Sequence, residues 1–261
     1  MKSICLLLLS GLLVSVAAAH SLYAEFSSDL SPDSNAEIWI AYGHNGSADT
    51  QLDSLPVARL ISPNHDKTDL KLAPYQSGLK GAVALKEPGT YILDLQMETS
   101  LFDPTWFGAA GSKSLVEKYG RVLMTAGSDQ GFGWSSDTGL EIVPENDPHS
   151  LQSGQEFKAR ALWNGKPISG SYNAVLTRSP QDVLVIMHAQ ATEVEATSSD
   201  GEICFATTRP GLWVLSFEAT IDESGIWKAE SDDSKGHYKK GDELPYDQIA
   251  PTAYLTFWVK K

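Results

Sequence analysis

The stretch Ser198–Ala219, SSDGEICFATTRPGLWVLSFEA, combines two turn signals with two strand signals. Asp200-Gly201 predicts a tight turn that leads into a short alternating strand. Pro210-Gly211 predicts a second turn, which leads into a strand rich in aromatic residues. A series of paired turns and short strands of this kind is typical of a small β-sandwich.

Segments of the same type recur along the chain, rich in β-branched and aromatic residues and bounded by Gly, Pro, Asn and Asp. The predicted strands are Ala36–Tyr42, Thr90–Glu98, Arg121–Ala126, Glu156–Gly165, Tyr172–Arg178, Asp182–Ala189, Leu212–Thr220 and Ala253–Lys260. The segment Ser112–Gly120, SKSLVEKYG, instead predicts a helix of one or two turns. We therefore expect an all-β protein made of two consecutive β-sandwich domains, Ig-like or transthyretin-like.

The boundary between the two domains is predicted in the polar, turn-rich segment Glu141–Gln155. Pro144 and Pro148 in this segment cannot donate a ladder hydrogen bond, so a continuous strand is disfavoured there. The expected division is residues 20–143 for the first domain and residues 144–261 for the second.

The first nineteen residues have the pattern of a secretory signal peptide. Lys2 precedes an apolar run from Ile4 to Val16, which is too short to span a bilayer, and small residues follow it. Ala17 and Ala19 place the predicted cut before His20, and a cut after Ala18 is the competing choice. No later stretch is apolar enough to cross a membrane. We therefore expect a periplasmic or secreted protein with no membrane insertion after cleavage.

The composition excludes several classes of function. The formal net charge is −13, and loss of the leader removes Lys2 and no acidic residue, so we expect no nucleic-acid partner. Cys5 would leave with the leader, so Cys204 has no disulfide partner, and its place between Ile203 and Phe205 predicts a buried, inert thiol. The sequence has no nucleophile elbow, no zinc-protease histidine pair and no phosphate-binding loop, so we do not expect an enzyme.

A histidine at the start of an exported chain can hold one metal ion with two nitrogens. The free α-amine titrates near ~7.7–8.0 and the imidazole near ~6.5, so both can lose a proton to a metal at neutral pH. His20 is therefore the first predicted ligand. If cleavage left Ala19 in front, the amine, the backbone amide and the imidazole would offer three nitrogens instead.

His44 is the second predicted ligand, because it follows a predicted strand whose alternation Gly43 interrupts. If the first strand paired beside Ala36–Tyr42, the ends of both strands would bring His20 and His44 together. His237 is the third predicted ligand: it lies in a charged loop that could fold over the site from the second domain, although a solvated loop is the simpler interpretation.

The remaining histidines are interpreted as structural. His65 is expected in an exposed turn, His149 in the linker between the domains, and His188 in an apolar strand with a satisfied hydrogen bond.

Several short motifs resemble the DUF4198 family. They are the leader that ends at a histidine, AYGH (41–44), GLEIVP (139–144), NGKPISGS (164–171), the pair SDGEICF (199–205) and RPGLWVL (209–215), and TAYLTFWVK (252–260). The second half also resembles the carboxypeptidase regulatory-like, transthyretin-like sandwich. The resemblance implies a secreted protein with a two-part β architecture that is linked to nickel and cobalt uptake.

The function expected from the sequence is therefore capture of Ni or Co by the mature N-terminal histidine, in support of a metal-uptake transporter. The enzyme-class alternative is a copper protein of the histidine-brace type, which would be an oxidative enzyme or a copper chaperone. The third alternative is a structural or adhesive pair of β-sandwiches that binds no metal.

Overall fold

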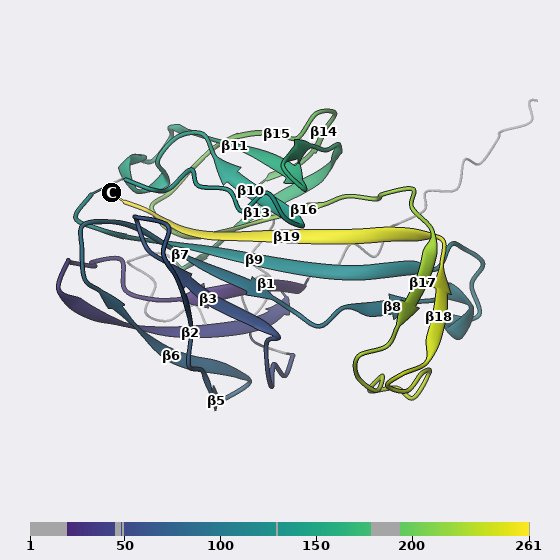
Figure 1. Cartoon of the computed structure of the whole chain (residues 1–261). Coiled ribbons are helices and arrows are strands. Elements are labelled where there is room, and N and C mark those ends of the chain that lie inside the picture. The colour runs from purple at the N-terminus through teal and green to yellow at the C-terminus, as the bar shows by residue number, and fades with distance from the viewer. Residues whose placement is uncertain (1–19, 45–47, 49, 129, 179–193, 261) are drawn as a thin grey trace, which may run out of the picture.

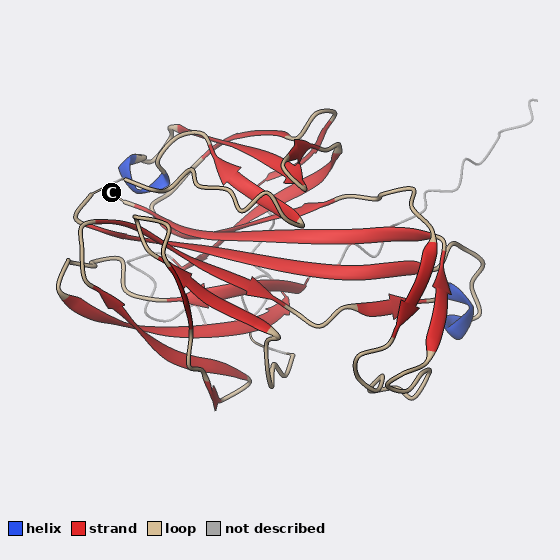
Figure 2. Ribbon diagram, viewed as in Figure 1, coloured by secondary structure: helices blue, strands red, loops and turns tan. Residues whose placement is uncertain are grey.

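The computed structural model describes residues 20–44, 48, 50–128, 130–178 and 194–260. Figure 2 shows that strands dominate this part of the chain and that its two helical elements are short. These are the 3₁₀ turns η1 (Pro104–Phe107) and η2 (Pro148–Ser150), each preceded by an aspartate whose side chain accepts a backbone N–H of the turn. The all-β prediction is confirmed.

The strands described form three larger sheets, and the longest of them lies between the other two (Figure 1). In order across this central sheet, the strands are β14 (Val194–Ser198), β13 (Gly170–Arg178), β16 (Gly211–Glu218), β19 (Gln248–Val259), β9 (Ser114–Ala126), β7 (Gly89–Gln96), β3 (Val57–Ile61) and β4 (Lys67–Asp69). A further short strand, β8 (Ser100–Phe102), pairs with one end of β9.

One face of the central sheet is covered by a four-stranded sheet from the beginning of the chain. Its order is β1 (His20–Glu25), β2 (Ser34–His44), β6 (Gly78–Leu85) and β5 (Ala73–Tyr75). The opposite face is covered by a sheet of β10 (Leu140–Pro144), β11 (Glu156–Trp163), β12 (Lys166–Pro167) and β15 (Glu202–Ala206).

Alternation along the central strands explains how one sheet serves two cores. Leu123 of β9 and Leu255 of β19 lie in the core below β10, β11 and β15. Val122 of β9 and Tyr254 of β19 lie in the core below β1, β2 and β6. Because successive side chains point to opposite faces, a strand buried on both faces is an almost continuous apolar run.

The last strand connects the two halves of the chain. β19 pairs antiparallel with β16 of the second half and parallel with β9 of the first half. The predicted domain boundary, between residues 143 and 144, falls inside β10, and β10 pairs with β11. The central sheet is thus continuous across the boundary that the sequence predicts.

The helix predicted over Ser112–Gly120 is wrong, because most of this segment forms the first half of β9. β9 pairs with β19 on one side, from Ser114 to Val122, and from Tyr119 onward it pairs with β7 on the other. Pairing on both sides overrides a local sequence that contains good helix formers.

β9 and β19 extend beyond the sandwich and carry an arm at one end of the molecule (Figure 1). We use this name for the hairpin of β17 (Gly225–Lys228) and β18 (Glu243–Tyr246) with its connecting loop. The arm packs against Leu101 of β8 and Trp106 of η1. Leu101 forms a small buried core with Ala229 and Tyr238, and the partly buried residues around it are Trp106, Trp227, Leu244 and Tyr246.

The thiol of Cys204 is exposed, contrary to prediction, because β15 buries Ile203 and Phe205 and turns the residue between them outward. Burial of part of the side chain, with Glu156 nearby, raises the pKa of the Cys204 thiol, which keeps it protonated at neutral pH. No helix in the described part of the chain is long and apolar enough to cross a membrane.

Candidate metal centre at the start of β1

The first residue of β1 lies opposite the last residue of β2. The antiparallel register pairs His20 with His44, Leu22 with Tyr42 and Glu25 with Trp39. Residues directly opposite each other in such a pair lie on the same face of the sheet, with Cβ atoms about 4.5–5.5 Å apart. The predicted pairing of these two strands is confirmed, and it places the backbones of the two histidines side by side.

The beginning of β1 is held from two directions. The hydroxyl of Tyr254 donates a hydrogen bond to the carbonyl oxygen of His20 over 3.0 Å. The imidazole of His20 stacks on the ring of Tyr42, with centroids 5.3 Å apart and planes inclined by 25°. Leu22, Tyr23 and Ala24, which follow in the strand, are each at most 1% exposed. His20 is therefore the first residue of a strand whose following residues are buried.

β1 also packs tightly against the central sheet. A Cβ added at Gly120 of β9 would lie 2.8 Å from Cδ2 of Leu22, which is too close for two carbon atoms. The absence of a side chain at Gly120 lets β1 approach the sheet, and this approach brings His20 to the hydroxyl of Tyr254.

A row of polar residues crosses the central sheet beside this strand end. Thr252 of β19 pairs with Lys118 of β9 on one side and with Glu218 of β16 on the other. The ammonium group of Lys118 donates a hydrogen bond to the hydroxyl of Tyr42 over 2.5 Å and lies 4.8 Å from the centre of the Tyr42 ring. The row is thus connected to the ring that supports His20.

Burial changes the acid–base behaviour of two groups in this region. Burial, with Tyr42 and Glu218 nearby, raises the pKa of Tyr254 well above its ordinary value, so the hydroxyl stays protonated and can donate. Burial also raises the pKa of the Glu218 carboxyl, and the nearby charge of Lys118 opposes this rise.

The third predicted ligand, His237, lies in the arm and belongs to a different cluster. Its ring stacks on Trp106, with centroids 4.2 Å apart and planes inclined by 2°, and its Nδ1 lies 2.8 Å from a carboxylate oxygen of Asp233. The arm core contains Leu101, which pairs with Leu115 of β9. Leu115 is five residues, or roughly 16 Å of strand, from Gly120 beneath β1. His237 is not brought to His20.

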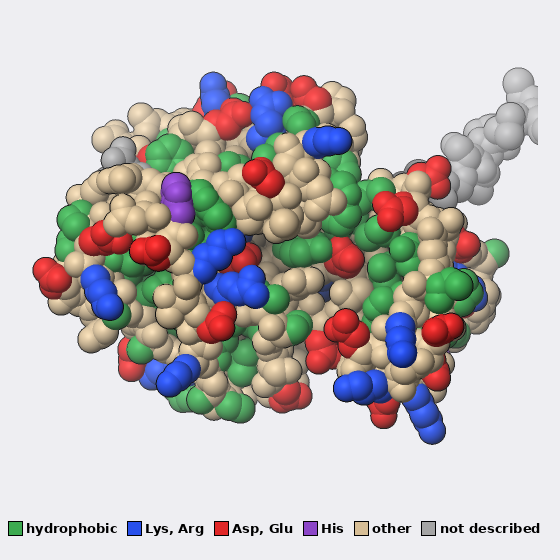
Figure 3. Space-filling view, in the orientation of Figure 1, with side chains coloured by type: hydrophobic (Ala, Val, Ile, Leu, Met, Phe, Trp, Pro, Cys, Tyr) green, Lys and Arg blue, Asp and Glu red, His purple; other side chains and the backbone are tan. Residues whose placement is uncertain are grey.

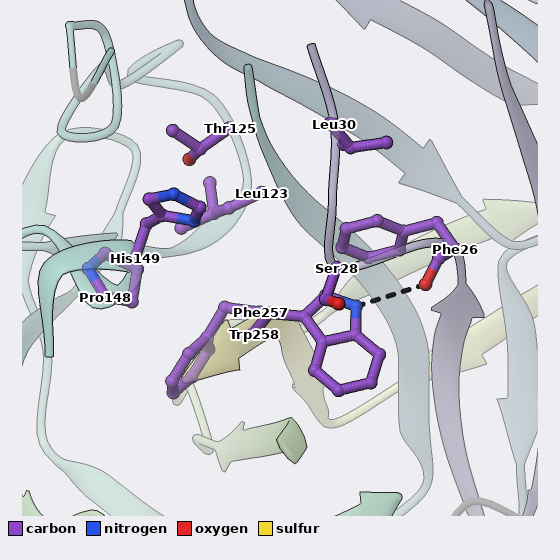
Figure 4. Close-up of a pocket in the computed structure, with 9 residues that line it drawn as sticks. All are labelled: Phe26, Ser28, Leu30, Leu123, Thr125, Pro148, His149, Phe257 and Trp258. Carbon is purple, nitrogen blue, oxygen red and sulfur yellow. Dashed lines mark hydrogen bonds between the residues drawn. The ribbon is translucent and has the colours of Figure 1, made fainter. Parts of the chain in front are cut away.

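The other histidines have separate surroundings. His65 is exposed in a turn with a positive φ of 70°, and its ring centroid lies 5.7 Å from that of Trp134. His149, interpreted as a linker residue, is partly buried and lines a cavity of about 10 Å³ with Phe26 and Trp258 (Figure 4). Burial lowers the pKa of the His149 imidazole. His188 lies outside the described residues.

The described residues contain no group of three or more His, Cys, Asp or Glu side chains that could hold a metal ion. The site at β1 would instead use two histidines and the α-amine that cleavage before His20 would create. Two imidazoles and an amine form an all-nitrogen donor set, which suits Ni(II), Cu(II) and Zn(II).

A second buried polar cluster has a structural role. Arg121 and Glu141 form an ion pair in which both side chains are at most 6% exposed. Arg121 also donates to the carbonyl of Trp134 over 2.8 Å, and Glu141 accepts the backbone N–H of Ser136 over 3.0 Å. These bonds fix the loop between β9 and β10. The cavity beside them measures about 10 Å³, room for one water molecule.

Acidic and basic side chains are mixed on the face of the molecule shown in Figure 3. The residues around His20 that sequence patterns did not single out are Tyr42, Lys118, Glu218 and Tyr254. Each comes from a different strand, so only the pairing of those strands shows that they lie together.

No curated protein matches the chain in sequence. Among solved structures, the chain is similar to the crystal structure of a DUF4785 family protein from Legionella pneumophila, with 11% sequence identity and a TM-score of 0.30. The similarity covers 77% of this chain and 53% of the Legionella chain, so this chain spans about half the length of that protein.

The family model of DUF4198, described as a domain of unknown function, matches residues 17–221. The match ends before β19, although β19 lies between β16 and β9 in the central sheet. The folded unit therefore extends past the matched residues. Because the match covers most of the sequence, from the residues before β1 to the end of β16, the chain belongs to the DUF4198 family.

Proposed function

We propose that this protein is exported and captures a divalent transition metal, Ni or Co, at the start of β1, and that it supplies this ion to a metal-uptake transporter. The protein is a carrier, not an enzyme, and works in the periplasm or outside the cell. The observation that carries the proposal is the register of β1 and β2, in which His20 lies opposite His44.

Capture needs little rearrangement of the chain. The α-amine and Nδ1 of His20 close a chelate ring on the ion, and His44 contributes a further imidazole. The buried strand and the hydrogen bond from Tyr254 hold His20 before the ion arrives. Ligands that are already ordered lose less conformational freedom on binding, which lowers the free-energy cost of association.

Release follows from the same chemistry. Every nitrogen in the donor set must be deprotonated to bind, so protonation competes with the metal. A transporter subunit with stronger or additional ligands then takes the ion. The acidic net charge of −13 favours cations over anions around the protein.

Copper is the second candidate cargo, because three nitrogens with one chelate ring favour tetragonal coordination and Cu(II) binds such donors more tightly than Ni(II) or Co(II). A copper protein of this type would be either a chaperone or an oxidative enzyme. Production of peroxide in the presence of ascorbate and copper separates these two, because a carrier has no such activity.

The test uses protein that begins at His20 and carries no N-terminal tag. Calorimetric titration with Ni(II), Co(II) and Cu(II) is expected to show one site per chain. His20→Ala is expected to weaken nickel binding by more than tenfold, because it removes the imidazole of the chelate. A tag placed ahead of His20 is expected to weaken binding as well, because it replaces the amine with an amide.

His237→Ala provides the matched control and also tests the third predicted ligand. From its place in the arm we expect this variant to bind nickel with unchanged affinity. Equal affinity of the parent protein and His20→Ala would reject the site at β1. Absence of heat with all three ions would favour a structural or adhesive protein.

A further inference from the structure

One carboxylate beside the metal centre has no hydrogen-bond partner in the described structure. Oε1 of Glu218 is buried and accepts no hydrogen bond. The other buried side-chain atoms without a partner are hydroxyl oxygens, of Ser198 and Thr256. A buried, unpaired carboxylate oxygen is costly, so its occurrence indicates a partner that is supplied in another form of the protein.

The position of Glu218 in the central sheet indicates which part of the chain could supply that partner. Leu22 packs over Gly120, and Gly120 belongs to the row Gly120–Tyr254–Ser216 across the central sheet. The next row of side chains on the same face is Lys118–Thr252–Glu218.

His20 is the first residue of β1, two residues before Leu22. Its carbonyl accepts from Tyr254, and its ring stacks on Tyr42, whose hydroxyl is bonded to Lys118. The Tyr254 hydroxyl that bonds the His20 carbonyl also lies close enough to Glu218 for this carboxylate to raise its pKa, so the first residue of β1 and Glu218 both lie near this hydroxyl.

The neighbouring cation already has other partners. The ammonium of Lys118 donates to the hydroxyl of Tyr42 and lies against its ring. In the uncleaved chain, the nitrogen of His20 is a neutral amide. Cleavage before His20 would turn it into an ammonium group with three donors, at the same end of β1 and with a charge opposite to that of Glu218.

We propose that Glu218 binds the α-amino group of mature His20, so that removal of the leader completes a buried ion pair and fixes the start of β1. The inference rests on the cleavage site assumed in the proposed function and does not require that a metal binds. In the absence of metal, Glu218 holds the ammonium group.

When a metal takes the lone pair of this nitrogen, the amine keeps two N–H bonds. Glu218 then accepts one of them and orients the amine toward the ion, as carboxylates commonly do for groups that bind a metal. Glu218 is thus a positioning residue for the chelate, and does not touch the ion.

The experiment compares thermal unfolding of two forms, both without metal and with chelator present. One form begins at His20, and the other keeps Ala18 and Ala19 ahead of it. We expect the first form to unfold about 3–6 °C higher. In Glu218→Gln this difference is expected to disappear, because an amide carries no charge. In the extended form the same substitution is expected to be neutral or stabilising, since it removes an unpaired buried charge.

Glu37→Gln is the control, because Glu37 is an exposed glutamate paired with Lys80 over 3.0 Å. It should leave the difference between the two forms intact. If Glu218→Gln lowers the unfolding temperature of both forms equally, its partner is Lys118 and the proposal is overturned. Survival of the difference in Glu218→Gln would overturn it as well.

A second measurement follows the amine itself and needs no variant. The α-amine of the His20 form is treated with an amine-reactive acylating reagent at pH 7, and the N-terminal peptide is quantified by mass spectrometry. We expect at least tenfold slower labelling in the folded protein than in denatured protein, and faster labelling in folded Glu218→Gln. Equal rates for folded and denatured protein would contradict the ion pair. Nickel titration of the same samples shows separately whether the proposed function holds.

Discussion

Replacement of Tyr254 by Phe removes a single oxygen atom from the support of the candidate site. Tyr254 is 1% exposed, and its hydroxyl donates to the carbonyl of His20 over 3.0 Å. The variant keeps the ring in the core below β1 and deletes only this donor. We expect a loss of stability and a loss of metal affinity, and the second is the informative one.

The magnitude follows from the bond that is lost. A buried hydrogen bond contributes about 1 kcal/mol net, and leaving a buried carbonyl without its donor adds about 1 kcal/mol or more. A total of about 2 kcal/mol corresponds to a fall of roughly 4–8 °C in the unfolding temperature of a chain of this size. A less ordered His20 must be fixed when the ion binds, so nickel affinity should fall by about 3–10-fold.

The matched control is Tyr172→Phe. The hydroxyl of Tyr172 donates to the carbonyl of Cys204 over 3.1 Å, and Tyr172 is 7% exposed in the other core. Both variants are measured by urea unfolding and by nickel titration. Tyr172→Phe should lose a similar amount of stability and keep its nickel affinity. If the two variants bind nickel equally, the hydrogen bond to His20 does not prepare the site and this reasoning is refuted.

Two further predictions concern the frame and its pH dependence. Glu141→Ala leaves the buried charge of Arg121 unpaired and should cost about 3–5 kcal/mol of stability in urea unfolding. Glu145→Ala breaks a partly exposed pair with Arg160 and should cost less than about 1 kcal/mol. Equal costs would contradict the structural role of the buried pair. Burial lowers the pKa of His149 below its ordinary 6.5, so the unfolded chain takes up this proton first and stability is lost as the pH falls through 6.5 toward the folded pKa. His149→Gln should therefore lose less stability than the parent protein between pH 7.5 and pH 5, and parallel curves would show that His149 is not responsible.

Much of the fold can be predicted from local sequence, because most strands are bounded by turn residues. Leu212–Thr220 and Ala253–Lys260 were expected as strands and lie mainly in β16 and β19. The segment Ser112–Gly120 was not, since its strand state depends on pairing with β19, which is more than 120 residues away in the chain. Parallel pairing of this kind leaves no local signal.

The candidate site was predictable in part. The pairing of His20 with His44 could be expected from the order of the first two strands. The role of Glu218 could not, because the last residue of a strand is ordinarily solvated, whereas here one carboxylate oxygen is buried. His237 was grouped with the others because its charged loop could fold over the site, and the structure instead places its ring against Trp106.

The most direct test of the account is a crystal structure of the protein that begins at His20, grown with nickel and measured at the nickel absorption edge. The account predicts an anomalous peak about 2 Å from both the α-amine and the imidazole of His20, with His44 as a further ligand. A peak elsewhere on the molecule, or a first residue that lies away from His44 and Glu218, would contradict it.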